Sequence, residues 1–186
     1  MAIERKELVS RHNPILKEID VKCPLSVGNG EFAFTADFTG LQTFYEKYRP
    51  YTPLCTQSQW GWHSFSNSEL ENKELKYEEF DTYGRSVGYP TDETGQKELF
   101  DHLRHNAHRL NLGRIALDIR TDEGEPIGLE GITHIHQELD LWRAILKSNF
   151  RVNNILVATE VCVHPVYDAL AVKVQSALAT DLCSLQ

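Results

Sequence analysis

The chain has 186 residues, 41% of them hydrophobic, which is enough for one sizeable core and predicts a single domain over residues 1–186. A formal net charge of -8, with no cluster of lysine and arginine, argues against binding to nucleic acid or to an anionic membrane. The sequence also lacks the apolar run of a signal peptide or of a bilayer span, so we expect a cytoplasmic protein.

The four cysteines do not form a metal or redox motif. Cys23, Cys55, Cys162 and Cys183 are far apart and include no Cys-x-x-Cys pair, so we expect buried free thiols. Cys162 precedes His164 by two positions, as a thiol nucleophile and its base might. Since nothing nearby supplies a third, orienting group, packing is the better interpretation of Cys162.

The first part of the chain predicts one clear strand. Residues 8–12 are expected to be short and extended, because Pro14 prevents them from continuing as a central strand. Gly28-Asn29-Gly30 is typical of a turn. After it, Phe32, Phe34, Ala36 and Phe38 alternate with Ala33, Thr35 and Asp37. This pattern predicts a strand with one aromatic face, followed by a turn at Thr39-Gly40.

The middle of the chain predicts the one substantial helix. Residues 67–80 are acidic and rich in lysine, which favours a solvated loop or a short helix. Near 95–105, Leu99, Phe100 and Leu103 form an apolar stripe at helical spacing. We expect a short helix there and no other of similar length.

The last third is rich in strand patterns separated by turns at 122–124 and 153–154. Strands at this spacing without intervening helices make an antiparallel meander rather than βαβ units. The predicted fold class is therefore mainly β, an antiparallel β-sandwich or a large twisted sheet. The predicted strands are 112–119, 135–141 (with Ile135, Gln137, Leu139 and Leu141 on one face), 155–163 and 169–174.

The stretch from Gln59 to Phe65 looks most like a binding surface. Trp60 and Trp62 stand around Gly61, beside His63. In an extended segment both indoles would project to one side, and glycine would leave the backbone approachable between them. Two flat apolar rings with a polar imidazole nearby suit a sugar, whose C–H face packs on an aromatic ring while its hydroxyls need hydrogen-bond partners.

The alternative is that both tryptophans are core residues, because most tryptophans of soluble domains lie in an apolar core. The surrounding segment, residues 49–65, carries two prolines, several hydroxyl residues and no clean alternation, as a long irregular connection would. Functional residues often lie on such loops. The predicted sugar-binding residues are therefore Gln59, Trp60, Trp62 and His63, with Gln59 as a hydroxyl partner.

Other clusters are weaker candidates for chemistry. His102, His105 and His108 recur every third residue, but the helix should end at Asn106, so solvated or capping histidines are favoured over a metal site. The sequence contains no Gly-Lys-Ser phosphate loop and no Gly-x-Ser-x-Gly elbow. We therefore predict no catalytic residue, no metal and no cofactor.

Acidic residues that might serve glycoside hydrolysis do not form an evident pair. Each of them lies in a predicted strand or turn where an ordinary surface role suffices. The residues considered are Glu31, Asp37, Asp81 and Asp140.

Three segments carry a resemblance to a known family. They are Leu25-Ser-Val-Gly-Asn-Gly-Glu-Phe, Leu139-Asp-Leu-Trp-Arg-Ala-Ile-Leu-Lys-Ser-Asn-Phe, and the strand, His164-Pro165 turn and strand between Thr159 and Val174. In this order they resemble the N-terminal β-sandwich domain of the (α/α)6-barrel, or six-hairpin, glycosidases and phosphorylases, the clan that contains glycoside hydrolase family 65. The resemblance covers most of the chain.

The resemblance implies a supersandwich-like domain that is the non-catalytic N-terminal part of a larger carbohydrate-active enzyme. In that clan the catalytic groups belong to a helical barrel that follows the sandwich, and we expect the sequence to end partway through the sandwich with the barrel absent. The implied partners are a carbohydrate and the barrel of the full-length protein, with Trp60, Trp62 and His63 walling the sugar site. An incomplete sandwich would leave apolar faces uncovered near Val172 and Val174 and would favour homo-oligomers.

Two other functions stay open. The chain could be a stand-alone carbohydrate-binding module that uses the Trp60 and Trp62 platform. It could instead be an interaction domain that pairs with a partner through an open sheet edge.

Overall fold

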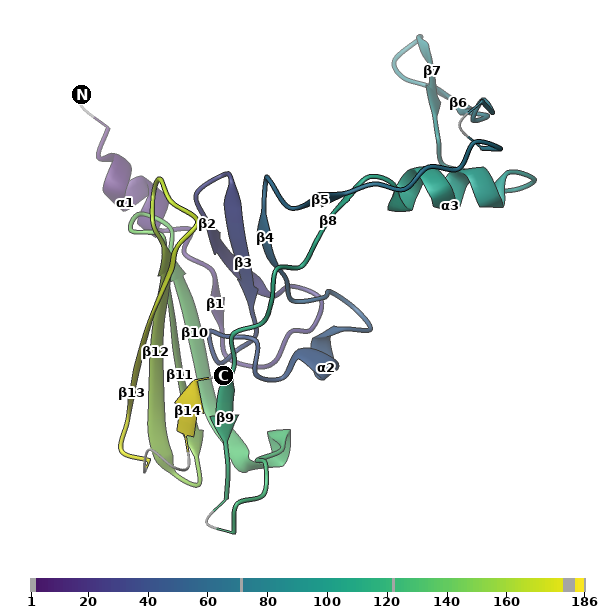
Figure 1. Ribbon diagram of the computed structural model, residues 1–186. Coiled ribbons are helices and arrows are strands. Elements are labelled where there is room, and N and C mark those ends of the chain that lie inside the picture. The colour runs from purple at the N-terminus through teal and green to yellow at the C-terminus, as the bar shows by residue number, and fades with distance from the viewer. Residues whose placement is uncertain (1–2, 71, 122, 179–182, 186) are drawn as a thin grey trace. The chain divides into compact units, whose positions relative to one another are not determined.

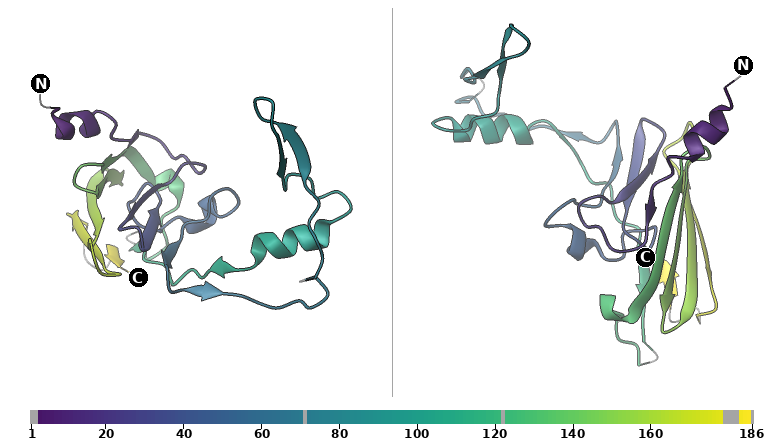
Figure 2. Two further views of the ribbon diagram at one scale, coloured as in Figure 1. Left: turned by 90° about the horizontal axis from the view of Figure 1, so that it is seen from above. Right: turned by 180° about the vertical axis from the view of Figure 1, so that it is seen from behind.

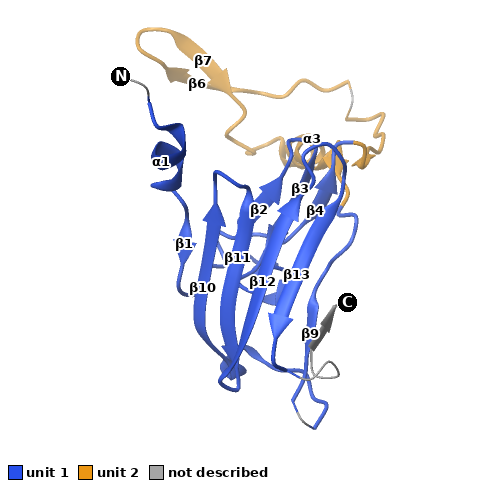
Figure 3. Cartoon of the chain, turned by 90° about the vertical axis from the view of Figure 1, so that its left-hand side faces the viewer, with its two compact units in different colours: residues 1–59, 111–186 blue, residues 60–110 orange. Residues whose placement is uncertain are grey.

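The computed structural model describes residues 3–70, 72–121, 123–178 and 183–185, and the side chains of these residues up to 178. The chain divides into two compact units, coloured separately in Figure 3. The larger unit comprises Met1–Gln59 and Asn111–Gln186, and the smaller unit comprises Trp60–Leu110. Each unit is described by itself below.

The larger unit is built on a five-stranded antiparallel sheet (Figure 1). Along the two strands of its central hairpin, residues 145–152 and 155–163, side chains alternate between buried and more exposed positions, as expected for strands with one face on a core. The strands, in spatial order, are β1 (Ile15–Leu16), β10 (Ile132–Asp140), β11 (Ile145–Val152), β12 (Ile155–Val163) and β13 (Leu170–Ser176).

A second layer faces this sheet, as the two views of Figure 2 show. Phe34 and Phe38 from this layer share one buried cluster with Leu146, Phe150 and Val157 of the five-stranded sheet, and the Phe38 ring meets the Phe150 ring edge-on at 6.0 Å. The predicted antiparallel β-sandwich is thus confirmed. The second layer contains β2 (Leu25–Gly28), β3 (Phe32–Ala36) and β4 (Thr56–Ser58), and a separate pair is formed by β9 (Leu117–Ile119) and β14 (Cys183–Leu185).

Most predicted strands of the sandwich are confirmed. β3 shows the expected alternation, with Phe32, Phe34 and Ala36 buried, and β12 has the predicted bounds. Asn153 and Asn154 both adopt positive φ angles, 47° and 68°, as a two-residue hairpin turn between β11 and β12 requires.

Two strand predictions have the wrong bounds: 112–119 is too long, and 135–141 both begins and ends later than β10. The segment 112–119 forms a strand only at β9, because its first residues pair elsewhere: the Leu112 N–H donates to the Thr56 carbonyl, and the Gln42 N–H donates to the Ile115 carbonyl. Leu141 lies beyond the end of β10 and is exposed, so it does not share the core face with Gln137.

The helices of the larger unit are short. The prediction of an extended segment over residues 8–12 is wrong, because α1 (Arg5–Ser10) is a helix that includes Leu8. None of its residues is buried, so local preference decides, and most of its residues are fair or good helix formers. The other two are α2 (Tyr45–Tyr48) and the 3-10 turn η1 (Leu129–Gly131).

A row of polar side chains crosses the core face of the five-stranded sheet. Gln137, Ser148 and Thr159 are cross-strand neighbours, and all three are buried. The Gln137 amide donates to the Asp37 carbonyl (2.7 Å) and to Ser148 Oγ (2.9 Å), and Thr159 Oγ1 donates to the Thr39 carbonyl (2.6 Å). The row therefore docks the loop that follows β3 onto the sheet.

Asp37 fixes the shape of that loop. The surface role expected for this residue is wrong, because its side chain is fully buried. Its Oδ1 accepts hydrogen bonds from the Thr39 N–H (2.7 Å) and hydroxyl (2.5 Å), and its Oδ2 accepts one from the Phe44 N–H (2.6 Å). Burial raises the pKa of Asp37 to about 6, although these hydrogen bonds act in the opposite direction.

The edge of the sandwich and the cysteines differ from expectation. Val172 and Val174 are half-buried and pack against the core, so the expectation that they are uncovered is wrong. Cys23 is exposed rather than buried, whereas Cys55 and Cys162 are half-buried free thiols, and burial raises the pKa of Cys55. The side chain of Cys183 lies outside the described residues.

No helix that the structure describes is both long enough and apolar enough to cross a membrane.

The smaller unit contains one helix and two short antiparallel pairs of strands. The predicted helix is confirmed as α3 (Lys97–His105), whose Leu99 and Phe100 are buried while Leu103 stays half-exposed. The loop or short helix predicted over residues 67–80 is confirmed as irregular structure up to residue 77 in the part that is described, but residues 78–80 belong to a strand. The strand pairs are β5 (Trp62–His63) with β8 (His108–Arg109), and β6 (Glu78–Asp81) with β7 (Ser86–Tyr89).

Candidate functional site

Both tryptophans of the predicted site are exposed. Trp60 is 68% exposed and Trp62 is 55% exposed, so the alternative that they are core residues is wrong. The Trp62 N–H donates to the Trp60 carbonyl at 3.0 Å, which is the hydrogen bond of a three-residue γ-turn. The segment is therefore not extended at Gly61, and the expected alternation does not hold across this glycine.

The β5–β8 ribbon decides which side chains lie beside Trp62. In its register Trp62 is opposite Arg109, and His63 is opposite His108. Because successive side chains of a strand point to opposite faces, Trp62 and Arg109 share one face of the ribbon while His63 and His108 share the other. The structure thus separates His63 from the indole that it was expected to assist.

Arg109 is the polar partner that Trp62 has instead. Its guanidinium carbon lies 5.0 Å from the centre of the Trp62 ring, within the range of a cation–π contact. Arg109 is half-buried, and it takes part in none of the ion pairs found among the described residues. We call Trp62 and Arg109 together the Trp62–Arg109 face.

The opposite face of the ribbon is a cluster of rings. The His63 ring centre lies 5.2 Å from that of His108 and 6.2 Å from that of Phe65, and Phe65 meets His102 edge-on at 5.4 Å. The side chain of Asn106 joins the end of α3 to the segment after β5, since it accepts from the Phe65 N–H (3.0 Å) and donates to the Phe65 carbonyl (2.8 Å). This face is therefore tied into the fold of the smaller unit.

The two histidines of α3 and His108 of β8 have different surroundings. His102 is buried, contrary to the expected solvated or capping role, whereas His105 and His108 are exposed. The helix ends at His105, as predicted, and His108 Nδ1 lies 2.8 Å from the His105 carbonyl oxygen at that end. Among the described residues, no three histidine, cysteine, aspartate or glutamate side chains converge closely enough to hold a metal ion.

Gln59 belongs to the larger unit, where its N–H donates to the Glu31 carbonyl (2.8 Å) and its side chain is exposed. The site within the smaller unit accordingly comprises Trp60, Trp62 and Arg109.

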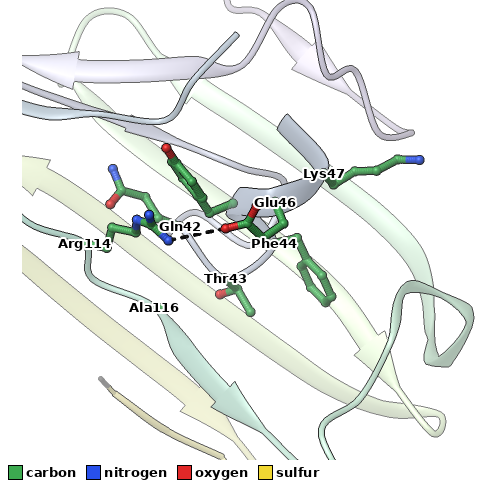
Figure 4. A pocket seen from close by; sticks show the side chains of 8 residues that line it. Gln42, Thr43, Phe44, Glu46, Lys47, Arg114 and Ala116 are labelled. Atoms are coloured by element: carbon green, nitrogen blue, oxygen red, sulfur yellow. Dashed lines mark ion pairs between the residues drawn. The ribbon is translucent and has the colours of Figure 1, made fainter. Parts of the chain in front are cut away.

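The larger unit has a cavity of its own, of about 460 Å³, which Figure 4 shows from close by. The Arg114 guanidinium lies 3.4 Å from the centre of the Tyr45 ring, and its Nη1 is 3.9 Å from Glu46 Oε1. Thr43 accepts a hydrogen bond from the Leu117 N–H. Because Arg114 already pairs with Glu46, and Gln42 and Thr43 already bond to the backbone, this cavity is less suited to a ligand than the exposed indoles.

Sequence reasoning missed Arg109. The two tryptophans stand out by their residue type and spacing, but the partner of Trp62 comes from a strand at the other end of the smaller unit. No local pattern marks Arg109, because cross-strand register is a property of the folded ribbon. Comparison of the chain with protein-family models, with curated proteins and with solved structures finds no match.

Proposed function

We propose that the smaller unit binds carbohydrate through Trp62 and Trp60, and that the chain is a non-catalytic β-sandwich portion of a glycoside hydrolase or phosphorylase. The exposure of both indoles, 68% and 55%, is the observation that carries the proposal. Large apolar rings left in water at neighbouring positions favour a ligand that covers them, and the C–H face of a pyranose is such a ligand.

Arg109 supports this proposal. Its guanidinium, which lies over the Trp62 ring, offers several N–H donors to the hydroxyls of a sugar that packs on the exposed part of the same indole. The enzyme part of the proposal rests on the sequence resemblance alone, which is an argument by analogy. It includes the expectation that a helical barrel of the full-length protein supplies the catalytic groups.

Tryptophan fluorescence tests the sugar site. A panel of neutral and acidic oligosaccharides is titrated into the chain, and at least one should quench the emission. Trp62→Ala should remove the response. Trp142→Ala is the matched control, because Trp142 is 49% exposed but belongs to the larger unit, and it should leave the affinity unchanged. A Trp62→Ala variant that binds as well as the parent chain would refute the platform.

Activity and mass test the enzyme part of the proposal. The chain alone should show no hydrolysis or phosphorolysis of α- or β-glucosides, and measurable turnover would contradict a non-catalytic role. An antibody raised against the chain should detect a product several times heavier than 21.3 kDa in an extract of the source cells. A band at 21.3 kDa would instead favour a stand-alone carbohydrate-binding module.

One observation favours a second function, partner recruitment through a sheet edge. In the part of the chain that the structure describes, β13 has a strand partner on one side only, β12. Such an edge can accept a strand from another chain. Light scattering at high protein concentration tests this function, and a strictly monomeric protein that captures no partner would count against it.

A further inference from the structure

The ends of the smaller unit that carry the β5–β8 ribbon are free of acidic residues. Residues 60–66 and 105–110 contain no aspartate or glutamate, although the chain as a whole has a net charge of -8. The ionisable side chains of these two segments are basic: His63, His105, His108 and Arg109. The local charge at the candidate sugar site is therefore opposite in sign to the charge of the chain.

Arg109 is the permanent charge in this region. Its guanidinium is held against the Trp62 ring rather than against a carboxylate, and no ion pair within the described ranges uses it. Three other arginines do pair with carboxylates: Arg49 and Arg114 with Glu46, and Arg120 with Asp118. A planar guanidinium with free N–H groups matches a carboxylate, which it can bind through two parallel hydrogen bonds.

We propose that the Trp62–Arg109 face selects acidic sugars, hexuronates, over the corresponding neutral hexoses. This inference rests on the proposed function, because it assigns a ligand class to the same site. A hexuronate carries its carboxylate on C5, at the edge of the pyranose ring. The sugar ring can therefore pack on the part of Trp62 that stays exposed, while the carboxylate meets the guanidinium that lies over the same indole.

Three hexuronate polymers, each with its carboxyl-reduced form, provide the test. Polygalacturonate, alginate and a β-1,4-glucuronan are compared with the neutral polymers made from them by reduction, which keeps the backbone and turns each hexuronate into a hexose. Affinity is measured by titration with tryptophan emission as the signal. We expect at least one acidic polymer to bind about tenfold tighter than its reduced form, and the difference to shrink as salt is added.

Two arginine variants make the assignment specific. Arg109→Gln should remove the preference, so that the acidic polymer and its reduced form bind with affinities within about twofold of each other. Arg104→Gln is the matched control, because Arg104 belongs to the same unit, stacks over Phe100 at 5.4 Å and carries the same charge. It should bind like the parent chain.

The outcomes distinguish a failure of hexuronate selection from a failure of the proposed sugar site. If the reduced polymers bind as tightly as the acidic ones, or if Arg109→Gln keeps the preference, the selection of hexuronates is wrong, while sensitivity to Trp62→Ala would leave the sugar site standing. If neither these polymers nor the neutral and acidic oligosaccharides bind, both the inference and the sugar site are wrong.

Discussion

Replacing Gly40 by alanine tests how tightly the loop after β3 docks on the five-stranded sheet. Gly40 has a φ of 82°, and an added Cβ would press on Thr159 Oγ1 and lie 3.0 Å from Ser148 Oγ. Two costs follow. The left-handed backbone costs an alanine about 1–2 kcal/mol, and forcing a methyl group into a packed site costs about 1–3 kcal/mol.

The hydrogen bond from Thr159 to the Thr39 carbonyl lies in the path of the new methyl group. Its loss adds roughly 1 kcal/mol, so we expect Gly40→Ala to lower the free energy of unfolding by about 3–6 kcal/mol. Urea unfolding followed by circular dichroism measures this change. The matched control is Gly30→Ala, at a φ of 95° with no atom within 4 Å of the added Cβ, which should cost only the backbone strain of about 1–2 kcal/mol.

Equal losses in the two glycine variants would refute the reasoning, because they would show that the contact with the polar row adds nothing to the strain. A second background sharpens the comparison. Thr159→Ala removes the hydroxyl that the methyl group meets, so Gly40→Ala should cost less in that background than in the parent chain. An unchanged cost would mean that Gly40 and Thr159 are not coupled.

Two further predictions concern a buried acid and a helix end. Burial raises the pKa of Asp37 from its ordinary 3.8 to about 6, so the folded chain holds this proton more tightly than the unfolded chain does. The resulting stabilisation, about 3 kcal/mol in all, is fully present below pH 3.8 and is lost as the pH rises to about 6. Asp37→Asn should remove this pH dependence of the free energy of unfolding, which urea unfolding across the same pH range measures. Asn106→Ala removes both hydrogen bonds to the Phe65 backbone and should cost about 1–2 kcal/mol locally, seen as faster hydrogen exchange at the Phe65 N–H; unchanged exchange would contradict the bridge.

Much of the sandwich was predictable because its strands carry local patterns. The alternation in β3 and the run from Ile155 to Val163 each mark a strand, and two asparagines mark the turn before β12. The apolar stripe of α3 is likewise local, since Leu99 and Phe100 meet on one side of the helix. A periodic pattern within about ten residues reports which side of an element is buried.

Features that depend on contacts between distant segments were not predictable. The burial of Asp37 follows from a loop that folds back on its own carboxylate and then docks on Gln137, 100 residues later. The pairing of Trp62 with Arg109 likewise depends on a register that no short motif encodes. The error at α1 has another cause. None of its residues is buried, so the intrinsic helix preference of these residues decides their conformation.

The two units use their polar and aromatic side chains in different ways. In the larger unit, Asp37, Gln137 and Thr159 are buried, and no buried side-chain nitrogen or oxygen that the structure describes lacks a hydrogen-bond partner. Such groups specify one packing of the sandwich. The smaller unit instead leaves Trp62 in water with a cation beside it, an arrangement that contributes little to a core. The tests of recognition proposed above therefore concentrate on the smaller unit.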